Sequence, residues 1–253
     1  MDLDRTMKYI GLVSSDWNEC LAPTGPFDPV AYLYPELKKE LDRIFKSYTS
    51  NEIPLSLAVS QINGILPKPF SPEQMDSYLD ASFAIYNGVL EMIEMLASKN
   101  ILFMINTTGA QGFFQRIIDR KLIPPAPIVA SNPFIKFAGV ETDPRFQYQV
   151  LETSDKASNT DSVMKKLGLT AAKVVIIGDS GGDGPHFAWG SSVGACLVGS
   201  MTKTSLTNYC RNNEVNMDRQ FGIVYRENQA RDLEGESRFD FRELGLWILE
   251  RLT

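Results

Sequence analysis

Residues 173–184 read K-V-V-I-I-G-D-S-G-G-D-G, a short apolar run that ends in a glycine-rich, acidic turn. Consecutive apolar side chains from Val174 to Ile177 predict a strand buried on both faces, as in a parallel sheet. Pro185 follows the turn and suits the first turn of a helix. Strand, turn and helix in this order predict an α/β unit with a ligand site at the carboxyl end of the strand.

The turn carries two carboxylates, Asp179 and Asp183. Carboxylates that lie close together without a partner repel each other and resist ionisation. A hard divalent cation with oxygen ligands would relieve this repulsion, so the turn predicts a metal site. The alternative that this stretch leaves open is a solvated polar turn.

Composition narrows the class of protein. The chain has 253 residues, 43% of them hydrophobic, and a formal net charge of -6. The length suits one α/β domain with a smaller module. The charge argues against a surface for nucleic acid or an anionic membrane, although it is compatible with a local basic pocket. His186 is the only histidine, so sites built on several histidines are excluded. We expect His186 to start or pack a helix, and contact with the substrate is the alternative.

Three widely spaced cysteines, Cys20, Cys196 and Cys210, indicate a reducing compartment rather than a disulfide framework. The first residues are charged and show no apolar signal segment. No apolar run reaches the roughly 18 residues of a membrane span. We therefore expect a cytoplasmic protein that has no membrane partner.

Apolar runs predict the other strands of the sheet, at 9–13, 101–105, 128–130, 195–198 and 222–225. Helical patterns lie between them, which predicts a doubly wound, mostly parallel α/β sheet of right-handed crossover units. Rough alternation at 134–138 and 146–150 predicts a β-hairpin. The polar stretch 226–238 predicts a mobile loop.

Residues 27–86 differ from the rest of the chain. Proline and glycine at 23–26 break the chain before them, and leucines then recur at helical spacing. Ser71, Pro72 and Gln74 form a capping-box start for a further helix. We therefore predict an inserted all-helical cap at 27–86 on an α/β core made of 1–26 and 87–253, and we expect the cap to fold over the edge of the sheet.

Four motifs resemble, in order and spacing, those of the haloacid dehalogenase (HAD) superfamily of phosphatases. They are D-W-N-E-C-L at 16–21, Thr107 after the second predicted strand, Lys156 at the start of a helix, and G-D-S-G-G-D at 178–183. The last of these is the most specific. The resemblance covers nearly the whole chain and is strongest for the phosphoserine-phosphatase-like branch, which has a helical cap.

The resemblance implies a Mg²⁺-dependent phosphomonoesterase that acts on a small phosphate ester through an aspartyl-phosphate on Asp16. It implies metal ligands from Asp16, Asp179, Asp183 and the backbone carbonyl of Asn18. It implies that phosphate oxygens are bound by Thr107, Lys156 and the amides of Trp17 and Thr108. A dication would reduce the repulsion between the attacking carboxylate and the phosphate.

Two positions depart from the family pattern. Asn18 stands where the general acid/base carboxylate is expected, and it cannot donate or accept a proton as an acid does. General acid–base help contributes roughly two to four orders of magnitude, so a slow enzyme is predicted. Cys20 stands where the family has threonine, and its thiol makes a weaker polar contact than a hydroxyl group.

An alternative register, with Ser14 at the nucleophile position and Asp16 as the acid, stays open.

Other functions stay open as well. A phosphonatase would need a cap lysine, for which Lys38, Lys39 and Lys46 are candidates, and a dehalogenase would not need the acidic turn. A different class is a metal- and phosphate-binding protein that has lost catalysis through Asn18. The substrate and the oligomeric state are not predicted, although Phe27, Tyr32 and Tyr34 are candidates for residues near the entrance.

Overall fold

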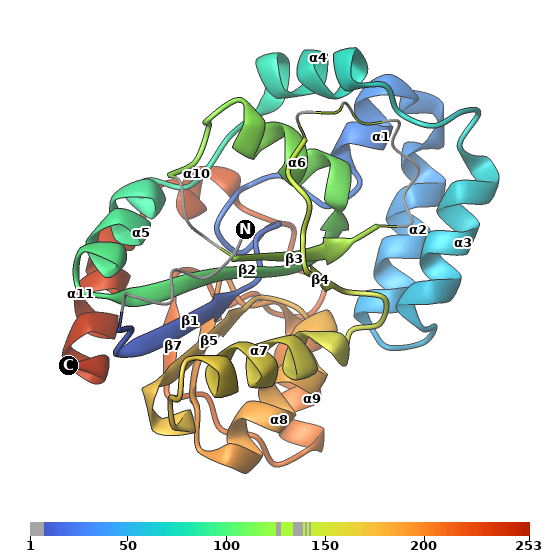
Figure 1. Cartoon of the computed structure of the whole chain (residues 1–253). Helices are drawn as coiled ribbons and strands as arrows, with labels where there is room; N and C mark the ends of the chain where they lie inside the picture. Colours follow the sequence, from blue (N-terminus) through green and yellow to red (C-terminus); the bar gives the residue numbers. More distant parts are fainter. Residues whose placement is uncertain (1–7, 125–127, 134–138, 140, 142) are drawn as a thin grey trace.

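The fold is a single parallel sheet with helices on both faces. The computed structural model describes residues 8–124, 128–133, 139, 141 and 143–253 (Figure 1). Within them the strand order is β4-β3-β2-β1-β5-β6-β7, and all the paired strands run parallel. The predicted doubly wound α/β fold is confirmed. The strands are β1 Gly11–Ser15, β2 Ile101–Ala110, β3 Ile128–Asn132, β4 Tyr148–Gln149, β5 Val174–Gly178, β6 Cys196–Ser200 and β7 Arg219–Phe221.

Helices fill the connections between the strands. The α-helices are α1 Asp28–Leu33, α2 Lys38–Thr49, α3 Leu55–Ile65, α4 Pro72–Ser82, α5 Val89–Ser98, α6 Gln111–Asp119, α7 Asp155–Lys166, α8 Gly184–Val193, α9 Thr204–Asn212, α10 Leu233–Glu236 and α11 Phe241–Leu252. Short 3₁₀-helices cover Pro35–Leu37, Ala171–Lys173 and Gly181–Asp183. None of the helices in the described part of the chain has the length and apolar character needed to cross a bilayer.

The central strands are buried on both faces because alternate side chains enter two different cores. Val13 and Val175 pack with α5, α6 and α11, whereas Leu12 and Val174 pack with α7, α8 and α9. Figure 1 shows these helix groups on opposite sides of the sheet. Such two-sided burial explains the near-continuous apolar run of β5. It also leaves the carboxyl ends of β1 and β5 as the place where polar side chains collect.

The segment 27–86 contains α1, α2, α3 and α4. Ser71 and Gln74 form the expected capping box at α4. The helix α2 lies over the sheet edge, where the hydroxyl of Tyr48 is 3.0 Å from that of Thr108. The side chain of Asn51 donates to the carbonyl oxygen of Gly181 at 3.1 Å. This helical segment therefore covers the carboxyl edge near β1 and β5.

The helix α4 is joined to α6 by ion pairs. Arg116 on α6 donates to both carboxylate oxygens of Asp76, at 2.9 and 2.8 Å. The same guanidinium pairs with Asp119 and Asp143, each at 3.0 Å. Arg120 pairs with Asp80 at 2.5 Å. A nearly buried arginine thus ties the last helix of the segment to the α/β core.

Several predicted elements are wrong in their position. β2 does not end at residue 105 but runs to Ala110, because the β-branched Thr107 and Thr108 continue it through a register shift against β3. The predicted strand at 222–225 is absent, because Gly222 has φ +81 and turns the chain after β7. β1 lies two residues later than predicted, at Gly11–Ser15.

Two further predictions need correction. β4 pairs in parallel with β3, so 146–150 joins the main sheet, and the other arm of the predicted hairpin, 134–138, lies outside the described residues. The stretch 226–238 is not a loop throughout: it contains α10, and Arg231 within it donates to Glu236 and to the carbonyl oxygen of Pro23. The helix α9 was not predicted.

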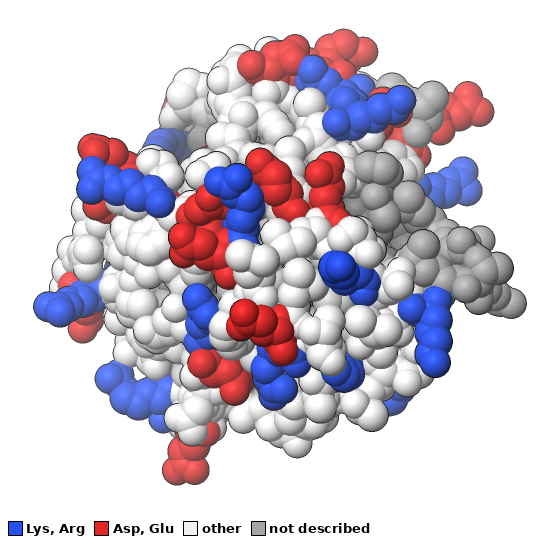
Figure 2. All heavy atoms as spheres, turned by 90° about the vertical axis from the view of Figure 1, so that its left-hand side faces the viewer, with Lys and Arg blue, Asp and Glu red and all other residues white. Residues whose placement is uncertain are grey.

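Figure 2 shows one face of the molecule, the left-hand side of Figure 1. Acidic and basic side chains lie next to one another on it, separated by uncharged areas. No broad basic area is visible on this face.

Candidate active site

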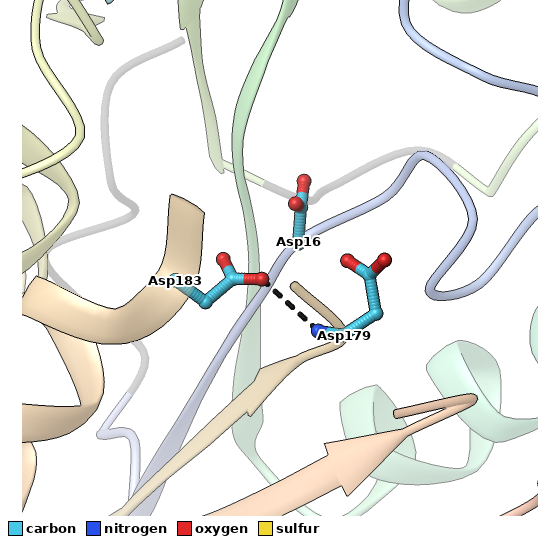
Figure 3. Close-up of side chains that lie close together, drawn as sticks. All are labelled: Asp16, Asp179 and Asp183. Carbon is cyan, nitrogen blue, oxygen red and sulfur yellow. Dashed lines mark hydrogen bonds between the residues drawn. The ribbon is translucent and has the colours of Figure 1, made fainter. Parts of the chain in front are cut away.

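Three carboxylates meet at the carboxyl edge of the sheet (Figure 3). Asp16 directly follows β1, Asp179 directly follows β5, and Asp183 ends the 3₁₀-helix before α8. One oxygen of each lies within 4.8 Å of the others. The reason is the parallel pairing of β1 with β5, which sets Ser15 beside Ile177, so that the residues after the two strands emerge together. The exposed fractions of Asp16, Asp179 and Asp183 are 7%, 1% and 0%.

Lys156 lies in the first turn of α7 and is fully buried. Its ammonium nitrogen Nζ is 3.0 Å from Oδ2 of Asp16 and 2.6 Å from Oδ1 of Asp183. Burial alone would lower the pKa of Lys156, but the two carboxylates outweigh it and raise the pKa. Lys156 is therefore a permanent positive charge between the two acids.

Asp183 is fully satisfied by hydrogen bonds. Its Oδ2 accepts from the backbone amides of Asp179 and Ser180 at 3.0 and 3.2 Å, and its Oδ1 accepts from Lys156. Burial would raise the pKa of Asp183, but Lys156 and these amides hold it below its usual value. Asp183 is thus ionised and fixed, which suits it to orient the turn.

Asp179 is in the opposite condition. Neither carboxylate oxygen of Asp179 accepts a hydrogen bond within the described part of the chain. The ammonium of Lys203 lies 2.7 Å from Oδ2 as an ion pair outside hydrogen-bond geometry. Burial raises the pKa of Asp179 well above its usual value, although Lys203 opposes the shift. The carboxylate of Asp179, buried next to Asp16 and paired with Lys203 through one oxygen, offers oxygen donors of the kind that a hard cation such as Mg²⁺ takes.

One carboxylate oxygen of Asp16 accepts a hydrogen bond, and the other forms an ion pair. Its Oδ1 accepts from the backbone amide of Trp17 at 2.7 Å, and its Oδ2 faces Lys156. Burial raises the pKa of Asp16, and Lys156 and a hydrogen bond from Thr107 act in the opposite direction. The amide of Trp17 is therefore used by Asp16 in this structure.

Asn18 and Thr107 lie on the same side of the site. The hydroxyl of Thr107 donates to Oδ1 of Asn18 at 3.4 Å and accepts from the amide of Gly109 at 3.2 Å. The side-chain amide of Asn18 donates to the carbonyl oxygen of Thr24 at 3.3 Å. The hydroxyl of Thr108 faces Tyr48 of α2. The structure thus brings together the site residues named from the sequence: Asp16, Trp17, Asn18, Thr107, Thr108, Lys156, Asp179 and Asp183.

Ser14 lies apart from the carboxylates. It is within β1, and its hydroxyl is 2.7 Å from that of Thr160 and accepts from Asn106 at 3.1 Å. These contacts attach β1 to α7. When Asp16 is taken as the nucleophile position, the carboxylate lies at the carboxyl edge of the sheet. The hydroxyl of Ser14 instead lies within β1 and contacts α7.

His186 packs a helix. It is buried in α8, and its Nε2 is 2.9 Å from the hydroxyl of Thr160. Burial and the nearby positive charge of Lys156 lower its pKa to about 3, so the ring is neutral at physiological pH. This agrees with the packing role expected for His186.

The cap residues considered from the sequence pack or pair locally. Phe27 contacts Phe45 and Tyr48, Tyr32 contacts Tyr78, and Tyr34 contacts Phe70. Lys38 is paired with Asp42 on the exposed side of α2 at 2.8 Å. Phe27 is therefore in the interior of the helical segment, whereas the side chain of Tyr32 is exposed.

Sequence reasoning missed a second set of charges beside the carboxylates. Lys203 follows β6 and pairs with Glu19 as well as with Asp179. Arg231 pairs with Glu19 at 2.9 Å and with Glu236 at 2.8 Å. The available signal was the position of Lys203 just after a buried strand, because such residues lie at the carboxyl edge.

Comparison with known proteins identifies the fold. No protein-family model and no curated protein matches the sequence. A substrate-bound phosphoserine phosphatase is similar over 96% of this chain and 98% of its own, with 16% identity and a TM-score of 0.67. A phosphoserine phosphatase with an analogue of the phospho-aspartyl intermediate is similar over 97% of this chain and 100% of its own, with 16% identity and a TM-score of 0.67.

A structure with a lower similarity supports the same fold. A HAD-family hydrolase from Salmonella enterica serovar Typhi is similar over 85% of this chain and 68% of its own, with 11% identity and a TM-score of 0.58. The resemblance found in the sequence is confirmed at the level of the fold. This chain has the haloacid dehalogenase-type fold of phosphoserine phosphatase.

Proposed function

We propose that this protein is a Mg²⁺-dependent phosphomonoesterase and that Asp16 is its nucleophile. One observation carries the proposal: the carboxylate of Asp16 lies within 4.8 Å of the unsatisfied carboxylate of Asp179 and is held by Trp17 and Lys156. A nucleophilic carboxylate, a fixed cation and an open metal ligand are what phosphoryl transfer to aspartate needs.

In the first step Oδ2 of Asp16 attacks the phosphorus of the ester. A bond forms between this oxygen and phosphorus, and the bond from phosphorus to the alcohol oxygen breaks. The released alkoxide takes a proton from water, because Asn18 has none to give. Lys156 and the hydroxyl of Thr107 lie where they can bind the phosphoryl oxygens, Lys156 as a compact charge. In the second step the oxygen of a water bonds to phosphorus and the bond from phosphorus to Oδ2 of Asp16 breaks, which restores the carboxylate. The proton that this water loses neutralises the hydroxide left by the first step, and phosphate leaves.

The proposed ligands of Mg²⁺ are Asp16, Asp179 and the backbone carbonyl of Asn18, with Asp183 close to them. Asp179 is the residue best suited to bind the ion directly, because its oxygens are free of hydrogen bonds in the described part of the chain. Asp183 is better suited to support the turn, because both of its oxygens already accept hydrogen bonds. When bound, Mg²⁺ supplies positive charge that reduces repulsion between the carboxylate and the phosphate.

We propose a small phosphate ester of the cytoplasm as the substrate, with the helical segment 27–86 as a cap over the site. The burial of the three carboxylates and the contact between Tyr48 and Thr108 support a closed state in which water is largely excluded. Opening of the cap would admit the ester.

A second candidate is a metal- and phosphate-binding protein without turnover. The observation that favours it is Asn18, whose amide is bonded to Thr107 and Thr24 where the family pattern has an acid. Such a protein would keep the cation site and the phosphate contacts. It would lack only the proton transfer.

The test is a screen of phosphate esters with Mg²⁺ and with EDTA, on the wild type, on Asp16→Asn and on a control. Asp161→Asn is the matched control, because Asp161 also pairs with a lysine but lies on the outer side of α7. We expect hydrolysis that needs Mg²⁺, is lost in Asp16→Asn and is kept in the control. Equal activity in the wild type and Asp16→Asn would refute the nucleophile. Phosphate binding without hydrolysis of any ester would favour the second candidate.

A further inference from the structure

A cavity lies next to the carboxylates, on the side of Lys203. It has a volume of about 490 Å³ and lies where the end of α2, the start of α9 and the segment after β7 meet. Ligand pockets in proteins have volumes of about 300 to 1,000 Å³, so the cavity can hold a substantial part of a small molecule. Its lining residues with charged side chains are Lys46, Lys203, Arg226, Glu227 and Arg231.

The lining is basic in a protein of net charge -6. Lys203 and Arg231 are already paired with carboxylates. Lys46 and Arg226 are exposed and form no ion pair within the residues that the structure describes. Glu227 also lines the cavity, and its negative charge offsets part of the positive charge of Lys46 and Arg226. Two free cations therefore face a cavity whose other basic groups are neutralised.

Uncharged donors complete the lining. Thr49, Ser50, Thr204 and Ser205 contribute hydroxyl groups. The cavity also meets the first residues of α9, a helix end that carries partial positive charge. Hydroxyls, a helix N-terminus and two free cations together match the oxygens of a phosphate or a carboxylate.

The cavity and the carboxylates share one wall. Lys203 lines the cavity, and its ammonium is 2.7 Å from Oδ2 of Asp179. Thr49 also lines the cavity, and its carbonyl oxygen is so close to Gly181 that any side chain at position 181 would clash with it. Lys203 and the contact between Thr49 and Gly181 therefore separate the cavity from the carboxylates in this structure, so that a single ligand reaches both only when the cap opens.

We propose that this cavity binds a second anionic group of the substrate, a phosphate or a carboxylate, with Lys46 and Arg226 as the residues that select for it. The inference rests on the proposed phosphatase function, because it defines the ester as one that carries an additional negative group. Lys46 belongs to the helical segment 27–86 and Arg226 to the α/β core, so the second anion contacts both parts of the chain. Substrates with a neutral tail leave these cations without a partner.

The experiment compares glucose 6-phosphate with glucose 1,6-bisphosphate as substrates. The double variant Lys46→Gln/Arg226→Gln removes both free cations and leaves the carboxylate site unchanged. Lys39→Gln is the control, because Lys39 is exposed on the same helix α2 and does not line the cavity. We expect kcat/KM of the wild type and the control to favour the bisphosphate about tenfold or more. The double variant is expected to lose this preference and to keep its activity on the monophosphate. A wild type without the preference, or a double variant that retains it, overturns the proposal.

A binding measurement distinguishes failure of this proposal from failure of the proposed phosphatase function. Inorganic pyrophosphate is titrated calorimetrically into the protein in EDTA, where no hydrolysis is needed. We expect about tenfold weaker binding to the double variant than to the wild type and the control, and equal binding overturns the proposal even if the protein is a phosphatase. Pyrophosphate should also inhibit hydrolysis of the bisphosphate. If pyrophosphate instead accelerates hydrolysis of the monophosphate, the anion is a separate effector and the assignment to the substrate is wrong.

Discussion

Lys156 and Lys203 each bridge two carboxylates at the same edge of the sheet, but their surroundings differ. Lys156 is fully buried between Asp16 and Asp183, and the oxygens of Asp183 are all engaged. The side chain of Lys203 is 22% exposed and leaves the oxygens of its partner Asp179 without hydrogen bonds in the described part of the chain. The first lysine is thus held on both sides by the fold, and the second lies beside the carboxylate of the proposed Mg²⁺ site.

The largest expected difference is in stability. Lys156→Met leaves two buried carboxylates without a cation, so it should lower the free energy of unfolding by about 3 to 5 kcal/mol. Lys203→Met should lower it by only about 1 to 2 kcal/mol, because Arg231 still pairs with Glu19 and because Asp179, whose pKa is raised, can take up a proton when its cation is gone. Urea denaturation in EDTA measures both values. Similar losses in the two variants would contradict the comparison.

A second prediction concerns position 18, where the acid of the family pattern can be restored. Asn18→Asp should raise turnover of an alkyl phosphate by about a hundredfold, because the new carboxyl group can protonate a poor leaving group. The gain for an aryl phosphate should be small, since that leaving group needs little protonation. Steady-state kinetics on a matched alkyl and aryl ester measure both gains. Equal gains on the two esters would show that position 18 does not act on the leaving group.

The two aspartates of the acidic turn should respond to pH in opposite directions. The folded-state pKa of Asp179 is raised above the usual 3.8, so in metal-free protein its contribution to stability is lost as pH rises above about 4. The pKa of Asp183 is lowered, so its contribution is present above 3.8 and is lost as pH falls below that value.

The measurement is the free energy of unfolding in EDTA between pH 3 and pH 7. Asp179→Asn should become more stable relative to wild type as pH rises, because the carboxyl group whose raised pKa makes its ionisation costly is gone. Asp183→Asn should become less stable relative to wild type over the same range. The same trend in both variants would remove the distinction between the two aspartates.

The smallest expected effect is that of the metal itself. Mg²⁺ at ten times its dissociation constant should raise the free energy of unfolding by about 1.4 kcal/mol, because it binds only the folded chain. Asp179→Asn should abolish this increase and Asp161→Asn should keep it. Thermal melts with Mg²⁺ and with EDTA provide the measurement. An increase that persists in Asp179→Asn would place the ion elsewhere.

The sequence predicted the part of the site that depends on local pattern. The strand β5 was recognisable because its side chains are apolar on both faces, and the acidic turn after it follows directly. Thr107 was placed after its strand, whereas it lies within β2, because Thr107 and Thr108 have a strand preference that the polar composition concealed.

What the sequence did not reveal depends on contacts between distant residues. Glu19, Lys203 and Arg231 are far apart in the chain, and no spacing rule links them. Arg231 lies in a polar stretch that is typical of a loop, yet its guanidinium is held by two carboxylates. The apolar residues after Gly222 resembled a strand, but the positive φ at that glycine directs them out of the sheet.

The ion pairs of Arg116 distinguish α4 from the other helices of the segment 27–86. α4 is held to α6 by a nearly buried guanidinium that contacts Asp76, Asp119 and Asp143. α2 and α3 meet the core through fewer charged contacts, among them Glu152, whose carboxylate accepts from the amides of Leu55 and Ser56. In native-state hydrogen exchange, the amides of α4 should therefore open together with the core, and those of α2 and α3 should exchange at a lower free energy as a separate cooperative unit. For the segment as the proposed cap, this would mean that α2 and α3 open to admit the ester while α4 stays attached to the core.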